Sequence, residues 1–182
     1  MAEIKTNKAD AARRHLDAAI RMLFNQEDPV AIYTVVAAAF RILRILAERS
    51  GDSQFHETIK QMIRPGQENE FLSVMNKMGD YLKQADHNPD ELLDGVEEEV
   101  NDLTILGACM YYDSLGYQLT PEMRTFMVWF MTLHPELMAD SVPFNAHLAG
   151  SGGEAIRNQS RQVQLEVGKQ VLANTRGQNS SS

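Results

Sequence analysis

The sequence contains one cysteine, Cys109, among 182 residues. A single thiol excludes an intramolecular disulfide and a zinc site built from several thiolates. The first eight residues, Met-Ala-Glu-Ile-Lys-Thr-Asn-Lys, lack the apolar segment that defines a secretory signal peptide. We therefore expect a cytoplasmic protein, in which Cys109 is a small core residue.

The common patterns of metal and nucleotide sites are also missing. None of the five histidines has a glutamate three residues before it, and no two histidines are four residues apart. The ligand spacings of di-iron bundles and of zinc proteases are therefore absent. The glycine-rich segment 150–154 lacks the Lys and the Ser/Thr of a phosphate-binding loop, so we interpret it as a linker. We expect no metal and no cofactor.

Strand signals are absent as well, because no run of alternating β-branched residues is bounded by turns. Helix signals recur instead. Asp28-Pro29 and Thr120-Pro121 each combine an N-cap residue with proline at the first helical position. The sequence predicts an all-α bundle of about six helices plus a C-terminal helix. The expected bundle helices span residues 7–26, 28–49, 53–63, 67–85, 97–115 and 120–134.

We divide the chain into a helical bundle domain, residues 1–140, and a tail, residues 141–182. The tail begins with a Pro- and Gly-containing segment that is typical of a hinge. After it, a helix is predicted whose apolar face docks on its own bundle or on a second subunit. That face is expected to consist of Ile156, Val163, Val167 and Val171. The end, residues 178–182, is expected to be disordered.

Charge and hydropathy are unevenly distributed. Of the net charge of −8, residues 1–85 contribute +1, residues 86–140 contribute −11 and residues 141–182 contribute +2. The acidic stretch is interpreted as a solvated face in preference to a binding surface, and it makes nucleic-acid binding an unlikely function. The apolar run from Val30 to Leu46 is interrupted by Arg41 and Arg44, which favours a central buried helix over a membrane span.

Two groups of side chains are candidates for function. His87 lies in a polar connection with Lys83, Asp86 and Asp90, where a carboxylate can orient the imidazole and the lysine can meet an anion. The alternative is an interhelical turn whose polar side chains cap helix ends, and we favour it. The second group is a methionine stripe at four-residue spacing, which indicates core packing or, if exposed, a homodimer interface. It consists of Met123, Met127 and Met131.

Three segments resemble a family of small, uncharacterised bacterial helical proteins. The first is Asp-Pro-Val-Ala-Ile-Tyr-Thr-Val-Val-Ala-Ala-Ala-Phe at 28–40, with Tyr33 where the family commonly has histidine. The second is Tyr-Leu-Lys-Gln-Ala-Asp at 81–86, with Gln84 where histidine is usual. The third is Trp-Phe at 129–130 followed by His-Pro-Glu-Leu at 134–137. Together they extend over about residues 6–138.

The family is in turn similar to HEPN helical bundles, many of which are dimeric RNases of toxin–antitoxin and phage-defence systems. Their mark is an arginine, four to six residues, and then a histidine, contributed by both subunits. Arg49 and His56 have this spacing, although Ser50-Gly51 is predicted to end a helix between them. The resemblance thus implies a dimeric helical module.

Two functions follow from the sequence. The first is a non-enzymatic interaction or ligand-binding module, homodimeric and without membrane association, in which Tyr33, Lys83 and His87 meet a ligand or a protein partner. The alternative is a HEPN-like RNA-acting protein that uses His87 with Lys83, or Arg49 with His56. Substituting these histidines removes activity in the second case only.

Overall fold

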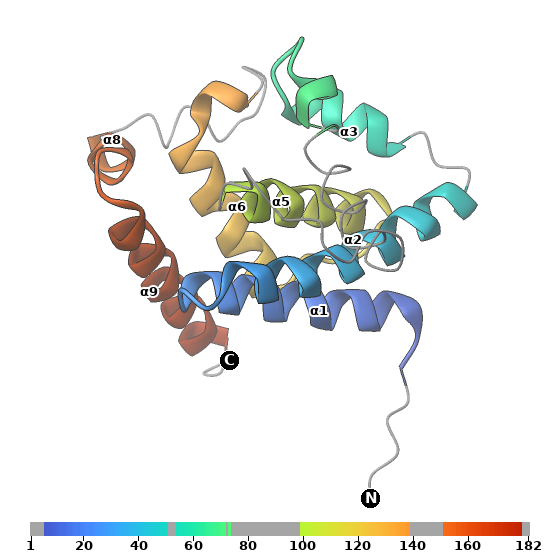
Figure 1. The fold of residues 1–182 in the computed structure, drawn as a ribbon, viewed down its shortest axis with the longest axis horizontal. Helices are drawn as coiled ribbons and strands as arrows, with labels where there is room; N and C mark the ends of the chain where they lie inside the picture. The colour runs from blue at the N-terminus through green and yellow to red at the C-terminus, as the bar shows by residue number, and fades with distance from the viewer. Residues whose placement is uncertain (1–5, 51–53, 72, 74–98, 139–150, 180–182) are drawn as a thin grey trace, which may run out of the picture.

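The computed structural model describes residues 6–50, 54–71, 73, 99–138 and 151–179, and the regular elements in these ranges are helices (Figure 1). The predicted all-α class is therefore confirmed. The extended pairing seen in these ranges is an isolated bridge between Ile63 and Met138. The helices are α1 (Lys8–Phe24), α2 (Pro29–Ser50), α3 (Gln54–Met62), α5 (Glu99–Ser114), α6 (Pro121–Leu133), the 3₁₀ helix η1 (Pro135–Leu137), α8 (Ser151–Arg157) and α9 (Arg161–Asn179).

Helices α1 and α2 form an antiparallel pair joined by a short turn (Figure 1). The Asn7 side chain caps α1 by accepting from the amide of Asp10. The predicted stripe on α1 is buried, and it packs against α2 and α5. The carboxylate of Asp28 accepts from the amides of Val30 and Ala31, so the predicted cap of α2 is confirmed.

Helix α2 supplies core side chains along much of its length, but it is not covered on all sides. Its described contacts are mainly with α1 and α5. Near its start, Val30 is 52% exposed, and Ala31 and Thr34 are exposed as well. Only one side of this first segment therefore faces the core, whereas the sequence predicted packing all round. By length and composition alone α2 would be able to cross a membrane, as would the core helix of many water-soluble folds.

Helix α5 lies at the centre of the described bundle and is buried on almost every side. Cys109 is fully buried there, as expected for a core residue, and burial raises the pKa of its thiol well above the usual value. Helix α6 follows with Thr120 as its N-cap, as predicted. The hydroxyl of Thr120 also donates to the buried carboxylate of Asp17 on α1, at 2.6 Å, which fixes the start of α6 against α1.

The methionine stripe of α6 belongs to the core. Met123 and Met131 are buried, and Met127 is partly buried against the same cluster. Between the two possibilities left open by the spacing, the structure selects core packing. The aromatic residues beside the stripe extend the core towards α1, where the Phe24 and Trp129 rings meet edge to face with centroids 5.4 Å apart.

The tail differs from its prediction at three points. Residues 151–153 begin α8 instead of completing a hinge, and α9 continues through Asn179 into the segment expected to be disordered. The face of α9 that packs on α1 and α6 is not the predicted valine face either. Val163 and Val171 are 42% and 43% exposed. The buried positions of α9 are Leu165, Gly168 and Leu172.

Gly168 explains why the packed face was missed. A Cβ atom at this position would lie 2.3 Å from Cε1 of Phe24, so the two helices approach too closely for any side chain. A glycine between two leucines at spacings of three and four does not register as an apolar position, and the valines on the opposite side complete a more regular pattern. Helix α9 docks on its own bundle, which was one of the two predicted arrangements.

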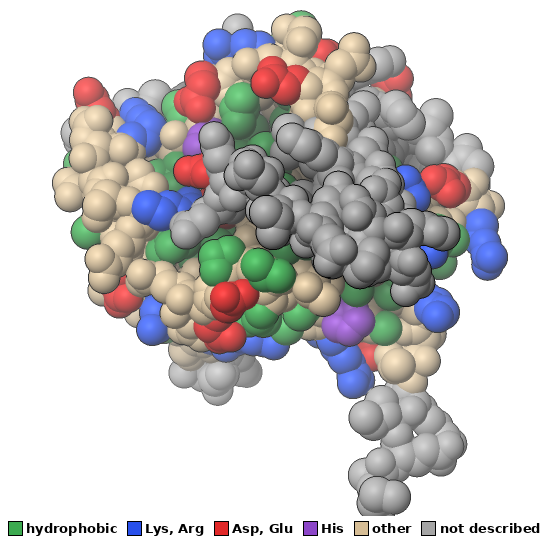
Figure 2. Space-filling view, viewed as in Figure 1, with side chains coloured by type: hydrophobic (Ala, Val, Ile, Leu, Met, Phe, Trp, Pro, Cys, Tyr) green, Lys and Arg blue, Asp and Glu red, His purple; other side chains and the backbone are tan. Residues whose placement is uncertain are grey.

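The acidic segment is also less uniform than expected. Asp102 and Glu122, both within 86–140, are buried and form ion pairs with arginines. The prediction of a solvated acidic face is therefore wrong for these two residues, although Glu99 and Asp113 are exposed. On the face drawn in Figure 2, acidic and basic side chains are interspersed over the described helices.

Candidate functional site

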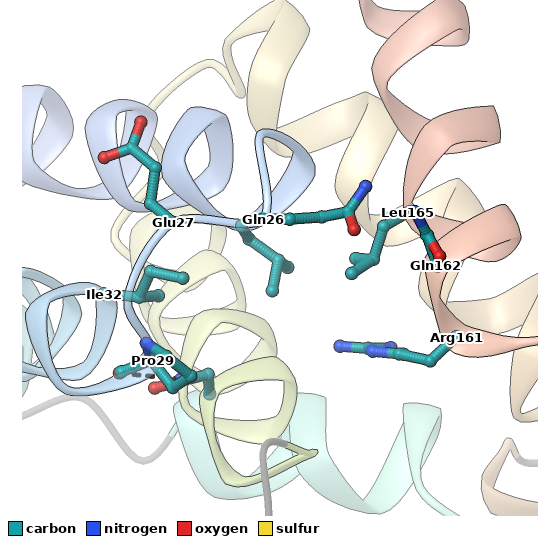
Figure 3. A pocket seen from close by; sticks show the side chains of 9 residues that line it. Gln26, Glu27, Pro29, Ile32, Arg161, Gln162 and Leu165 are labelled. Carbon is teal, nitrogen blue, oxygen red and sulfur yellow. Dashed lines mark hydrogen bonds between the residues drawn. The ribbon is translucent and has the colours of Figure 1, made fainter.

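A pocket of about 370 Å³ lies where the α1–α2 turn, the start of α5 and the start of α9 meet (Figure 3). Its volume is in the range of small-molecule sites. Four apolar side chains and one carboxylate combine with amides and a guanidinium around it. The lining residues are Leu23, Gln26, Glu27, Pro29, Ile32, Asn101, Arg161, Gln162 and Leu165.

The turn between α1 and α2 is held in an uncommon conformation at the rim of this pocket. The amides of Gln26 and Glu27 donate to the carbonyls of Leu23 and Met22, which forms a Schellman motif. This motif places Gln26 at φ 58°, a left-handed conformation that glycine usually occupies. Figure 3 shows the Gln26 side chain projecting from the turn towards α9. A glutamine is thus kept where the backbone favours glycine.

Asn101 forms the α5 side of the pocket and is only 4% exposed. Its Nδ2 donates to the carbonyl oxygen of Pro29 at 3.0 Å. Since that carbonyl can only accept, this bond fixes which end of the amide group faces α2. Oδ1 is left on the other side, buried and without a hydrogen-bond partner. Asn101 therefore presents a free acceptor in a position set by α2.

Arg161 enters from the start of α9 and points across the pocket towards Pro29 (Figure 3). Its Nη2 lies 2.8 Å from Oδ1 and 2.7 Å from Oδ2 of Asp102, and its guanidinium carbon lies 5.1 Å from the centre of the Trp129 ring. The Nε–H is buried and has no partner. Arg161 is held at two sides and keeps one donor unused.

Asp102 is fully buried behind Arg161. Burial raises the pKa of this carboxyl to about 6, although the charge and the hydrogen bond of Arg161 act to lower it and so does nearby His134. Oδ2 is close to Nη2 but is not aligned for a hydrogen bond. Of the five buried side-chain atoms without a partner in the described residues, three belong to Asn101, Asp102 and Arg161. Such atoms are rare in folded proteins, so their concentration here indicates a site.

The start of α9 is positioned by a network around Trp129. The indole Nε1 donates to the carbonyl of Gln164 at 2.7 Å. The Gln164 amide in turn donates to carbonyls at the end of α8 and in the following turn, and Arg157 donates to the carbonyl of Thr132 at 2.9 Å. The corner between α8 and α9 is thus fixed on α6. This fixes the origin of the Arg161 side chain before any ligand binds.

A second ion-pair cluster lies near the other end of α9. Glu122 on α6 accepts from Arg21 on α1 at 2.8 Å and from Arg176 on α9. Burial acts to raise the pKa of Glu122, but hydrogen bonds from Arg176, from its own backbone amide and from Arg21 outweigh it, so the pKa is lowered. No pocket is lined by these residues in the described part of the chain. This cluster is interpreted as a structural anchor.

The residues proposed from the sequence occupy different places. Tyr33 is 2% exposed in the core, and the neighbouring residue that lines the pocket is Ile32. Arg49 is exposed at the end of α2, and His56 lies on α3 beyond the end of α2 that Ser50-Gly51 predicted. Lys83, Asp86 and His87 lie outside the described residues, so their predicted roles are untested.

The pocket residues were not found by sequence reasoning. Asn101 and Arg161 are separated by 60 positions and match no motif. One signal was present: Asn101 and Asp102 interrupt an otherwise apolar helix, and adjacent polar residues in a buried helix need partners. The partner of Asp102 was not identifiable, because the valine pattern on α9 turned the expected core face away from α5.

No group of three or more His, Cys, Asp or Glu side chains suited to a metal ion occurs among the described residues. The polar groups of the pocket are suited to hydrogen bonding, and its walls to apolar contact. Comparisons of the chain with protein-family models, with curated proteins and with solved structures found no match.

Proposed function

We propose that this protein is a non-enzymatic helical module that binds a small molecule in the pocket at the start of α9. The observation that carries the proposal is the pair of unused polar atoms, Oδ1 of Asn101 and Nε of Arg161, in a pocket with apolar walls. Burying a polar atom without a partner costs about 1–3 kcal/mol. A ligand that satisfies both atoms recovers this cost on binding.

The arrangement also meets the general requirements of a binding site. The starts of α2, α5 and α9 converge on the pocket, so backbone dipoles add positive potential there. Leu23, Ile32 and Leu165 provide apolar contact. Because Arg161 is held by Asp102 and Trp129, little side-chain freedom remains to be lost when a ligand binds.

A fragment screen followed by amide chemical shifts tests this proposal. Fragments are expected to shift the amides of residues that line the pocket. Gln162→Trp, at an exposed position on the rim, should cover the pocket and remove these shifts. Gln170→Trp places the same side chain on an exposed part of α9 away from the pocket and should preserve them. Shifts that persist in Gln162→Trp, or no shifts at all, contradict the proposal.

The RNA-acting alternative and the expected homodimer stay predictions. Incubation with single-stranded and structured RNA tests the first, with His56→Ala and His87→Ala as variants. Cleavage that disappears in either variant would replace the ligand-binding proposal. Sedimentation equilibrium of the full chain measures the second.

A further inference from the structure

We infer that the ligand of this pocket is a neutral, planar molecule with an amide edge, such as a carboxamide or a lactam on a small ring. This inference rests on the proposed function and narrows it to a ligand class. It follows from the hydrogen-bonding types of the two free atoms. Oδ1 of Asn101 requires a donor, and Nε–H of Arg161 requires an acceptor.

The orientation of Asn101 makes the first requirement strict. If its amide group were turned over, Oδ1 would face the carbonyl oxygen of Pro29, and two acceptors would meet at 3.0 Å. The observed orientation exchanges that repulsion for a hydrogen bond. The free atom in the pocket is therefore an oxygen, and it binds a ligand N–H or O–H.

Charge disfavours an anionic ligand. The guanidinium of Arg161 is already paired with Asp102, which is fully buried, and Glu27 adds a second carboxylate at the rim. A carboxylate ligand would accept from Nε but would present only acceptors to Oδ1 of Asn101. An amide edge provides one acceptor and one donor in a single plane, so it satisfies both atoms.

The rest of the pocket sets the size and shape. A volume of about 370 Å³ accepts a small ring system, and Leu23, Ile32 and Leu165 offer apolar surface to its faces. Water can make the same two hydrogen bonds. A ligand that reproduces both bonds and adds apolar contact displaces such water with a gain in affinity.

Nicotinamide and nicotinate form a suitable pair of probes, because they share the ring and differ in amide against carboxylate. We expect nicotinamide to bind at least tenfold more tightly to the full chain, measured by titration of amide chemical shifts. Arg161→Lys retains a positive charge for Asp102 but removes the Nε–H, and it should weaken nicotinamide binding by roughly tenfold. Arg176→Lys makes the same change at the other end of α9 and should leave binding unchanged.

Asn101→Leu provides a second variant, which removes the acceptor and leaves Arg161 intact. It should also weaken nicotinamide binding by about tenfold or more. Equal or tighter binding of nicotinate, or full binding by both variants, overturns the amide inference. If other fragments occupy the pocket while neither probe does, the ligand class is wrong and the proposed function stands. If no fragment occupies it, both fail.

Discussion

Helix α9 is held by an ion-pair cluster near each end, and the two clusters differ in how completely they are satisfied. Near the start, Arg161 meets Asp102 in a fully buried position, with three polar atoms of the cluster unpartnered. Near the end, Glu122 is bound by Arg21 and Arg176, whose side chains are partly exposed. The pKa of Asp102 is raised and that of Glu122 is lowered.

The difference shows that an ion pair is not by itself a measure of stability. One arginine does not offset the loss of water around Asp102, whereas two arginines and a backbone amide outweigh the burial of Glu122. The start of α9 also borders the pocket, and Gln26 is held there in a left-handed conformation. Imperfect packing is thus concentrated beside the proposed binding site, which is typical of functional regions.

Removal of α9 tests both clusters at once and should have the largest effect. A chain ending at Ala149 would leave Asp102 buried without a cation, at a cost of about 3–5 kcal/mol. It would also expose core surface now covered by Leu165 and Leu172. Since whole domains are stable by only about 5–15 kcal/mol, cooperative thermal unfolding should be lost.

The control for this truncation is a chain that ends at Asn179 and keeps every described residue. It should unfold as the full chain does. From the sequence alone, the glycine-containing hinge predicted that the tail contributes little and that truncation leaves a folded domain. A cooperative transition in the chain ending at Ala149 would support that earlier expectation and would show that neither cluster is needed.

Gly168→Ala separates the docking of α9 from its ion pairs. The added Cβ would lie 2.3–2.9 Å from three atoms of the buried Phe24 ring, midway between the two clusters. We expect a loss of about 3 kcal/mol in the free energy of unfolding, measured by urea denaturation. Gly177→Ala is the matched control, because a Cβ there meets nothing within 4 Å. It should be neutral or stabilising by up to about 1 kcal/mol.

Much of the fold was predictable from local signals, because caps and apolar stripes act within one helix. Asp28 and Thr120 cap the helices they were expected to cap, and Met123 and Met131 are in the core. Long-range pairing was not predictable. Asp102 and Arg161 are 59 residues apart, and nothing in either local sequence names the other.

The candidate site was missed for the same reason. Residues near the start of three helices build it, and only their packing brings them together. The sequence drew attention instead to histidines and to Tyr33, since these types carry chemistry in many proteins. Tyr33 is a core residue here, and its neighbour Ile32 faces the pocket.

The opposite pKa shifts predict opposite pH dependences for the two clusters. The pKa of Asp102 is about 6 in the folded chain against 3.8 as its ordinary value, so the folded state binds this proton more tightly. Its contribution to stability therefore falls as the pH rises from about 4 to 6, by roughly 2–3 kcal/mol, and is constant above that range. For Glu122, with a lowered pKa, stability is lost as the pH falls below about 4.5.

Urea denaturation of the parent, Asp102→Asn and Glu122→Gln at several pH values separates the two contributions. The difference between the parent and Asp102→Asn should decrease with rising pH between 4 and 6. Charged groups facing Asp102 from other parts of the bundle are Arg161, His134 and Glu99, and all three are retained in the variant. Differences of the same sign for both substitutions would contradict the contrast between the clusters.

The smallest expected effect concerns the conformation of Gln26 at the pocket end of α9. Gln26→Gly relieves a left-handed backbone that costs a non-glycine residue about 1 kcal/mol, so the free energy of unfolding should rise by about 0.5–1 kcal/mol. Asn25→Gly is the control in the same turn, since Asn25 has φ −85° and gains nothing from glycine. It should lower stability by a few tenths of a kcal/mol. Gln26 also projects towards α9 across the pocket (Figure 3), so the stabilised variant should bind fragments less tightly while the Glu122 cluster is unaffected. If Gln26→Gly is destabilising, the strain is absent and the contrast between the two ends of α9 is reduced to their ion pairs.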